Sequence, residues 1–134
     1  MGRVLVAEDS PEICQLLAIA LRREGIEVDC VSNGRDALNR ISQNGYSVLI
    51  LDLMMPIVSG FEVIEELARM KRERPPPATI VITAGRQRRE ELNSEVVIAV
   101  FTKPFDVFGL ARIIAGMAEA ARMSARNEGA DPPG

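Results

Sequence analysis

The sequence predicts an α/β fold in which five parallel strands form one sheet with helices on both faces. Short apolar runs alternate along the chain with segments whose apolar residues recur at helical spacing. Most of these runs are continuous, as in strands buried on both faces, and most end at a polar or charged residue. This alternation indicates βαβ units, in which a crossover helix joins each strand to the next parallel strand.

Five segments have the character of strands. Residues 4–7, 48–51 and 80–82 are apolar runs of the kind found in buried strands. Residues 26–31 alternate apolar and polar side chains, which predicts a half-exposed strand nearer an edge of the sheet. Residues 96–101 are expected to form the fifth strand.

Helices are expected between these strands. Ser10 can cap the first helix, and Gly25 suits its exit. Amphipathic helices follow the second and third strands, and the prolines at 75–77 end the later of the two. Residues 86–93, between the fourth and fifth strands, are only weakly helical.

The C-terminal part of the chain divides into a helix and a tail. Asp106 can cap a last helix with apolar residues along one face. From residue 124 onward the sequence has no apolar periodicity. We therefore expect one domain over residues 1–123 and a flexible C-terminal tail over residues 124–134.

Composition and charge exclude several classes of function. The formal net charge is −3, with 16 basic and 19 acidic residues, so neither a nucleic-acid surface nor a membrane surface is expected. The chain has 2 cysteines and no histidine, which argues against the usual zinc patterns and favours a reduced, cytoplasmic protein. Its apolar runs fall far short of the roughly 20 residues that span a bilayer, and we expect no signal peptide.

Polar side chains stand where four of the predicted strands end. Glu8 and Asp9 follow the first strand, Asp52 the third, Thr83 the fourth and Lys103 the fifth. Because the carboxyl ends of parallel strands share one edge of the sheet, these side chains are expected to converge. Clustered carboxylates repel one another, and a hard divalent cation such as Mg²⁺, which prefers oxygen ligands, would offset that repulsion.

The same arrangement suits phosphoryl transfer, in which catalysis depends on positioning and on neutralising charge around the transferred group. A carboxylate can act as the nucleophile and form an acyl phosphate. Asp52, which ends the most apolar run, is the predicted acceptor. Thr83 can donate its hydroxyl to one phosphoryl oxygen while Lys103 pairs with another.

Four motifs in this order and spacing resemble the receiver domains of two-component response regulators, the CheY-like family. They are Val4-Leu5-Val6-Ala7-Glu8-Asp9, Leu51-Asp52-Leu53-Met54-Met55-Pro56 with Gly60, Thr83-Ala84 and Lys103-Pro104-Phe105. The resemblance covers roughly residues 3–120 and implies a doubly wound, flavodoxin-like sheet with strand order 2-1-3-4-5 and five flanking helices.

The resemblance also implies a role for each matching residue. It places Mg²⁺ on four ligands, which are Glu8, Asp9, Asp52 and the backbone carbonyl of Met54. It makes Asp52 the phospho-acceptor, Thr83 the switch hydroxyl and Lys103 the phosphate contact, with a cis peptide bond between Lys103 and Pro104. The donor would be a sensor histidine kinase or a histidine phosphotransfer protein.

The sequence departs from the family's pattern near the fifth strand. Val100 stands where receivers usually carry Tyr or Phe, and Phe101 cannot replace that residue because successive strand residues point to opposite faces. Residues 93–97 replace the family's Gly-Ala-Asp element, in a segment about two residues shorter than usual. We therefore expect a displaced or shortened fourth helix and fifth strand, and an altered readout of phosphorylation.

The sequence thus predicts a stand-alone receiver domain that takes a phosphoryl group on Asp52 and signals through a conformational switch or passes the phosphate on. It would not be an enzyme beyond its own phosphorylation and dephosphorylation. Its output would go to a protein partner that the sequence does not identify, with weak homodimerisation left open.

Two alternatives are kept beside this prediction. One is a degenerate receiver that acts as a protein-interaction module without phosphorylation, which the substitution at Val100 makes plausible. The other is an aspartate-nucleophile phosphatase. It is less favoured because Met54 occupies the place where such enzymes typically carry a second Asp.

Overall fold

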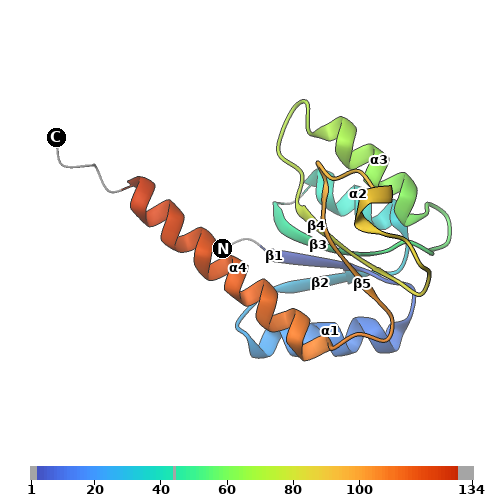
Figure 1. Ribbon diagram of the computed structural model, residues 1–134, viewed down its shortest axis with the longest axis horizontal. Coiled ribbons are helices and arrows are strands. Elements are labelled where there is room, and N and C mark those ends of the chain that lie inside the picture. Colours follow the sequence, from blue (N-terminus) through green and yellow to red (C-terminus); the bar gives the residue numbers. More distant parts are fainter. Residues whose placement is uncertain (1–2, 44, 130–134) are drawn as a thin grey trace.

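Five parallel strands form one sheet in the order β2-β1-β3-β4-β5 (Figure 1). The computed structural model describes residues 3–43 and 45–129, with side chains described as far as residue 120. The strands are β1 (Arg3–Ala7), β2 (Val28–Val31), β3 (Tyr46–Asp52), β4 (Ala78–Thr83) and β5 (Val97–Thr102). Strand order and parallel pairing are as predicted, and the half-exposed second strand lies at an edge.

Helices cover both faces of the sheet. They are α1 (Pro11–Arg23), α2 (Gly34–Gln43), α3 (Gly60–Met70) and α4 (Val107–Gly129), and a 3₁₀ turn, η1 (Arg89–Glu91), precedes β5. Helices α1 and α4 pack together on one face, whereas α2 and α3 pack together on the other (Figure 1). The doubly wound α/β architecture predicted from the sequence is confirmed.

Two apolar clusters, one on each side of the sheet, hold these layers together. The residues of β1 divide between them in alternation: Leu5 and Ala7 belong to the cluster under α2 and α3, and Val4 and Val6 to the cluster under α1 and α4. Because the central strands bury both faces, their sequences are continuous apolar runs.

Local signals fix both ends of α1 and the short loop that precedes it. Ser10 is the N-cap of α1, and its Oγ accepts the backbone N–H of Ile13 at 3.4 Å. Gly25 follows α1 with a φ of 78°, a conformation that favours glycine. The helix start at Ser10 leaves Glu8 and Asp9 in a short loop at the carboxyl edge of the sheet.

The connection between β4 and β5 differs from the expected five-helix arrangement. Instead of a helix over residues 86–93, the chain there forms only the 3₁₀ turn Arg89–Glu91. Leu92 is the one buried residue of that segment, so the segment has no apolar face on which a full helix could pack. The expected shortening of the fourth helix is confirmed. The expected count of five helices is wrong, since the described residues form four α-helices.

The C-terminal helix is longer than expected. Helix α4 continues to Gly129, so the predicted boundary after residue 123 falls within a helix. Residues 118–126 are rich in alanine and arginine, which are strong helix formers. The segment can therefore be helical although its sequence has no apolar periodicity. The rest of the expected tail, residues 130–134, lies outside the described residues. Among the described helices, α4 included, none combines the length and the apolar character needed to cross a bilayer.

Candidate functional site

The carboxyl ends of the strands bring the predicted site residues to one edge of the sheet. Asp52 is the last residue of β3, which lies between β1 and β4. Glu8 and Asp9 follow β1, and Thr83 is the last residue of β4. Lys103 follows β5, and its backbone N–H donates to the Thr83 carbonyl oxygen at 2.8 Å. The convergence expected from the strand ends is therefore present in the fold.

Three carboxylates form a compact cluster at this edge. One carboxylate oxygen from each of Glu8, Asp9 and Asp52 lies within 4.8 Å of the other two. Glu8 and Asp52 are only 1% and 2% exposed, whereas Asp9 faces solvent. The Ser10 N–H donates to Glu8 Oε2 at 3.0 Å, and the Met54 N–H donates to Asp52 Oδ1 at 3.1 Å. Backbone donors thus hold one oxygen of each buried carboxylate.

The Lys103 ammonium contacts the other oxygen of both buried carboxylates. Its Nζ lies 2.7 Å from Glu8 Oε1 and 3.5 Å from Asp52 Oδ2. The Glu8 contact is an ion pair without the angles of a directional hydrogen bond, so this buried oxygen retains capacity for a further ligand. Burial lowers the pKa of Lys103, but its contacts with Glu8 and Asp52 outweigh burial and raise it. The ammonium therefore stays charged.

The negative charge of the cluster exceeds what one ammonium compensates. Burial, and after it the neighbouring Glu8 carboxylate, raise the pKa of Asp52 to about 7, although the Met54 N–H and the Lys103 charge act in the opposite direction. A cation among the three carboxylates would supply the missing positive charge. The donor set fits a hard ion such as Mg²⁺, which takes oxygen ligands and keeps several waters.

Thr83 presents a hydroxyl whose proton is free for donation. The residue is 1% exposed, and its Oγ1 accepts the Gly85 N–H at 3.0 Å. A hydroxyl that accepts one bond can still donate another. The Lys103–Pro104 peptide bond beside it is cis, which confirms what the resemblance implied.

The loop after Asp52 is packed closely against the start of α3. The Gly60 N–H donates to the Leu53 carbonyl oxygen at 3.0 Å. A Cβ at Gly60 would lie 2.4 Å from the Asp52 carbonyl oxygen, so only glycine fits there. The Met54 side chain is 69% exposed, in keeping with a role for its backbone alone. That the Met54 carbonyl is a metal ligand stays a prediction.

Val100 and Phe101 lie on opposite faces of β5. Val100 packs against the cluster under α2 and α3, whereas Phe101 packs against the cluster under α1 and α4. Phe101 therefore does not take the place of the aromatic residue that receivers usually carry at position 100, as the alternation along a strand predicted.

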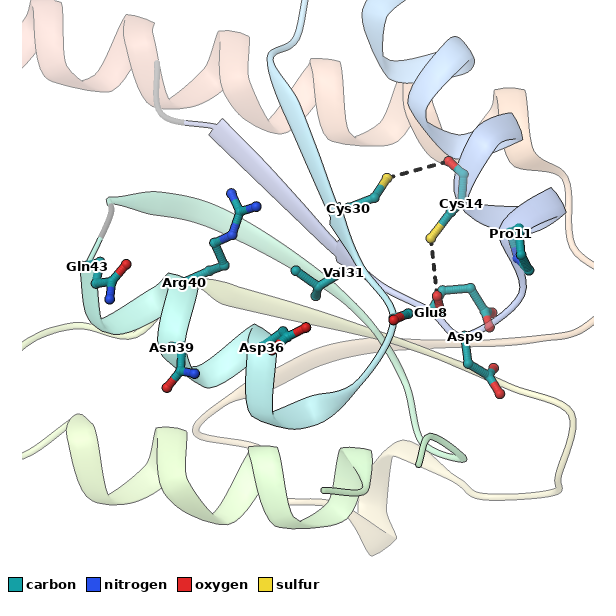
Figure 2. A pocket seen from close by; sticks show the side chains of 11 residues that line it. Glu8, Asp9, Pro11, Cys14, Cys30, Val31, Asp36, Asn39, Arg40 and Gln43 are labelled. Carbon is teal, nitrogen blue, oxygen red and sulfur yellow. Dashed lines mark hydrogen bonds between the residues drawn. The ribbon is translucent and has the colours of Figure 1, made fainter. Parts of the chain in front are cut away.

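Two further residues lie beside the site, Cys14 in α1 and Cys30 in β2. Both line a pocket whose wall includes Glu8 and Asp9 (Figure 2). The Cys14 thiol donates to the Glu8 carbonyl oxygen at 3.2 Å. Their spacing in the sequence gave no signal, because the contact depends on how β1 pairs with β2 and how α1 packs on the sheet.

Comparison with known families agrees with this geometry. The sequence profile of the response regulator receiver domain matches residues 4–115. The chain belongs to the response regulator receiver domain family. Receiver domains are signalling domains of two-component systems rather than classical enzymes. The matched residues include the acidic cluster of Glu8, Asp9 and Asp52.

Curated relatives are mostly longer proteins. The transcriptional regulatory protein TcrA of Mycobacterium tuberculosis is 42% identical over 82 residues, which are 61% of this chain and 31% of TcrA. The sensory transduction protein RegX3 of Mycolicibacterium smegmatis is 32% identical over 135 residues, which are 97% of this chain and 55% of RegX3. The chain thus spans about a third to about half of the length of these relatives.

Solved receiver structures share the fold. The response regulator TrrA of Thermotoga maritima, determined in complex with Mg²⁺ and BeF, is 34% identical with a TM-score of 0.72, covering 85% of this chain and 96% of that one. The signal receiver domain of a LuxO repressor protein from Vibrio parahaemolyticus is 26% identical with a TM-score of 0.81, covering 96% of this chain and 98% of that one.

Proposed function

We propose that this receiver domain accepts a phosphoryl group on Asp52, with Mg²⁺ bound beside it, from a sensor histidine kinase or a histidine phosphotransfer protein. One observation carries the proposal: Asp52 clusters with Glu8 and Asp9 within 4.8 Å and shares the Lys103 ammonium with Glu8. An aspartate that only capped a helix would need neither a second buried acid nor an ammonium shared with that acid.

We assign the metal to three carboxylates and one backbone carbonyl, those of Glu8, Asp9, Asp52 and Met54. The excess negative charge of the cluster supports the assignment. So does TrrA, which is described in complex with Mg²⁺ and BeF and is 34% identical to this chain. When bound, Mg²⁺ would neutralise charge and so reduce the repulsion between Asp52 and an incoming phosphoryl group.

In the transfer step, an Asp52 carboxylate oxygen attacks the phosphorus of the donor phosphohistidine. An O–P bond forms as the N–P bond breaks, and the imidazole leaves with a proton. Asp52 must be ionised to attack. Its pKa of about 7 in the metal-free protein therefore disfavours the reaction until the surrounding negative charge is neutralised.

Lys103 and Thr83 act on the phosphorylated form. Lys103, which is 3.5 Å from Asp52 Oδ2, pairs with a phosphoryl oxygen, and Thr83 donates its free hydroxyl proton to another. A turn of the Thr83 hydroxyl toward the phosphoryl group would break its contact with the Gly85 N–H, at the start of the connection that contains η1. This connection, rather than an aromatic side chain at position 100, carries the conformational change.

The signal leaves the domain through contacts with a protein surface, and the domain itself binds neither nucleic acid nor a membrane. The net charge of −3 supports this part of the proposal. TcrA and YkoG of Bacillus subtilis are named transcriptional regulatory proteins, and this chain spans 31% and 51% of their lengths. The partner surface belongs either to a separate protein, as the predicted stand-alone arrangement requires, or to a further domain of a longer chain.

Acetyl phosphate tests the proposal, because a small acyl phosphate can donate its phosphoryl group without a kinase. With Mg²⁺, the wild type should gain one phosphoryl group by intact-protein mass spectrometry, and Asp52→Ala none. EDTA should prevent the gain. Glu65→Gln, which removes an exposed carboxylate of α3, is the matched control and should behave as wild type.

An equal gain on Asp52→Ala would contradict Asp52 as the acceptor. No gain on the folded wild type would contradict phosphoryl transfer altogether. That result would favour the second candidate, an interaction module that works without phosphorylation. The specific observation behind this candidate is Val100 in the position where receivers usually carry an aromatic residue.

A further inference from the structure

Cys14 of α1 and Cys30 of β2 lie beside one another next to the acidic cluster (Figure 2). They are the only 2 cysteines in the sequence, and both are free thiols. The Cys30 thiol donates to the Cys14 carbonyl oxygen at 3.7 Å, so the two residues are in contact. The phosphoryl-transfer chemistry proposed above uses neither of them.

The fold holds this pair in contact. Strands β1 and β2 pair so that Val4 is opposite Val28 and Val6 is opposite Cys30. Because Val4, Val6 and Val28 belong to the core under α1, the Cys30 side chain points to the α1 side of the sheet. Cys14 lies early in α1 and packs against the same core. Packing of the helix on the sheet therefore fixes the positions of both thiols.

Both thiols can be reached from solvent, and they differ in reactivity. Cys30 is exposed and Cys14 half-buried, and both line a pocket at the surface. Hydrogen bonding with Cys14 lowers the pKa of Cys30 to about 7 despite partial burial. Cys30 is therefore the thiolate that reacts first, and Cys14 is the resolving thiol.

We propose that Cys14 and Cys30 form a reversible intramolecular disulfide in response to a hydroperoxide, which makes the pair a redox modification site beside the metal-binding cluster. Oxidation consumes both S–H donors, including the one that holds the Glu8 carbonyl oxygen at 3.2 Å. It also ties the start of α1 to β2, next to the loop that carries Glu8 and Asp9. The redox state of the pair is thereby coupled to the site.

The chemistry needs only the hydroperoxide. The Cys30 sulfur attacks one peroxide oxygen, so that an S–O bond forms, the O–O bond breaks and hydroxide leaves to become water. The Cys14 sulfur then attacks the sulfur of the Cys30 sulfenic acid. The S–S bond forms as the S–O bond breaks, and the oxygen leaves as water with the Cys14 proton. Two thiols and hydrogen peroxide give one disulfide and two waters, and a dithiol reverses the reaction by exchange.

Treatment of the full chain with hydrogen peroxide at neutral pH tests the proposal. The monomer should lose the mass of two hydrogens and yield a non-reduced cross-linked peptide that contains Cys14 and Cys30. Dithiothreitol should restore both thiols. Cys14→Ser should accumulate a Cys30 sulfenic acid that a 1,3-diketone traps. Cys30→Ser should react more slowly and form no bridge, and circular dichroism would verify that both variants fold.

Oxygen addition to either cysteine without loss of two hydrogens, or disulfides only between molecules, would overturn the proposal. So would a Cys14→Ser variant that is folded and yields no trapped Cys30. The Asp52→Asn variant separates this inference from the proposed function. It lacks the acceptor carboxylate but keeps both thiols, so it should still form the bridge although it gains no phosphoryl group.

Discussion

At the scale of single residues, the site is defined by an imbalance of charge around Asp52. One ammonium, that of Lys103, contacts two buried carboxylates, and a third carboxylate lies beside them. Burial, and after it the neighbouring Glu8 carboxylate, raise the pKa of the Asp52 carboxyl from its ordinary value of 3.8 to about 7. An ionised carboxylate here lowers stability, and we interpret that loss of stability as a consequence of the site's function.

The raised pKa of Asp52 predicts how stability depends on pH. Because the folded state binds this proton more tightly than the unfolded state, the associated stability is fully present below pH about 4 and is lost as pH rises through about 7. An amide at this position cannot ionise, so in EDTA at pH 8 the Asp52→Asn variant should have a free energy of unfolding about 2 kcal/mol above that of wild type. This value is smaller than the full free-energy equivalent of the pKa shift, because solvent screens part of the interaction. Urea denaturation at pH 5 and pH 8 measures this.

The difference in unfolding free energy between Asp52→Asn and wild type should become smaller as the pH falls to 5, because Asp52 is then protonated in the wild type as well. Glu65→Gln, in which the lost carboxylate is exposed on α3, is the control and should change stability by less than about 0.5 kcal/mol at either pH. If Asp52→Asn were less stable than wild type at pH 8, the excess of buried negative charge described here would be wrong.

At the scale of elements, the close packing of the Asp52 loop on α3 depends on Gly60. A Cβ at this first residue of α3 would lie 2.4 Å from the Asp52 carbonyl oxygen and 2.6 Å from the Leu53 Cα. Gly60→Ala should therefore displace the loop, cost roughly 2 kcal/mol of unfolding free energy and slow phosphorylation by acetyl phosphate. Urea denaturation and the rate of phosphoryl mass gain measure the two effects.

Gly116→Ala in α4 is the matched control for Gly60→Ala. Outside the local backbone of α4, no heavy atom lies within 4 Å of a Cβ built at Gly116, so alanine should stabilise the protein by roughly 0.5–1 kcal/mol. Equal stability of Gly60→Ala and wild type would mean that the loop after Asp52 is not packed against α3 as described.

Strands and helices could be predicted from the sequence where short stretches of residues determine them. Continuous apolar runs identified the buried strands, and the shared edge of parallel strands predicted that Asp52 would meet Lys103. The register along β5 placed Val100 and Phe101 on opposite faces, as expected. Residues 86–93 were overestimated as a helix, because their charged side chains have helix propensity but no apolar face to pack.

Contacts between different elements could not be predicted from the sequence. The Cys14–Cys30 pair depends on how β1 pairs with β2 and on how α1 packs across them, and no periodicity encodes either. The extension of α4 to Gly129 was missed for a different reason. The criterion was apolar periodicity, whereas alanine and arginine favour a helix through propensity alone.

At the scale of the whole molecule, binding of Mg²⁺ should stabilise the fold. Ten times the Kd of Mg²⁺ should add about 1.4 kcal/mol to the unfolding free energy, and EDTA should remove it. The rise in Tm should be larger at pH 8 than at pH 5.5, because a proton on Asp52, whose pKa is about 7, competes with the metal. Differential scanning calorimetry measures the rise in Tm.

Two variants sharpen the Mg²⁺ measurement. Glu8→Gln, which removes a carboxylate of the cluster, should greatly reduce the stabilisation by Mg²⁺, whereas Glu65→Gln should leave it unchanged. A wild-type Tm that does not respond to millimolar Mg²⁺ at pH 8, or a Glu8→Gln response equal to that of wild type, would contradict the assigned metal ligands.

The most direct test of the account is to locate the acyl phosphate. Borohydride reduces an acyl phosphate to an alcohol and leaves free carboxylates unchanged, so phosphorylated aspartate becomes homoserine. After incubation with acetyl phosphate and Mg²⁺, peptide mass spectrometry should find homoserine at position 52 alone, and not in samples that contain EDTA. Homoserine at another acidic residue, with Asp52 unmodified, would contradict the claim that Asp52 accepts the phosphoryl group.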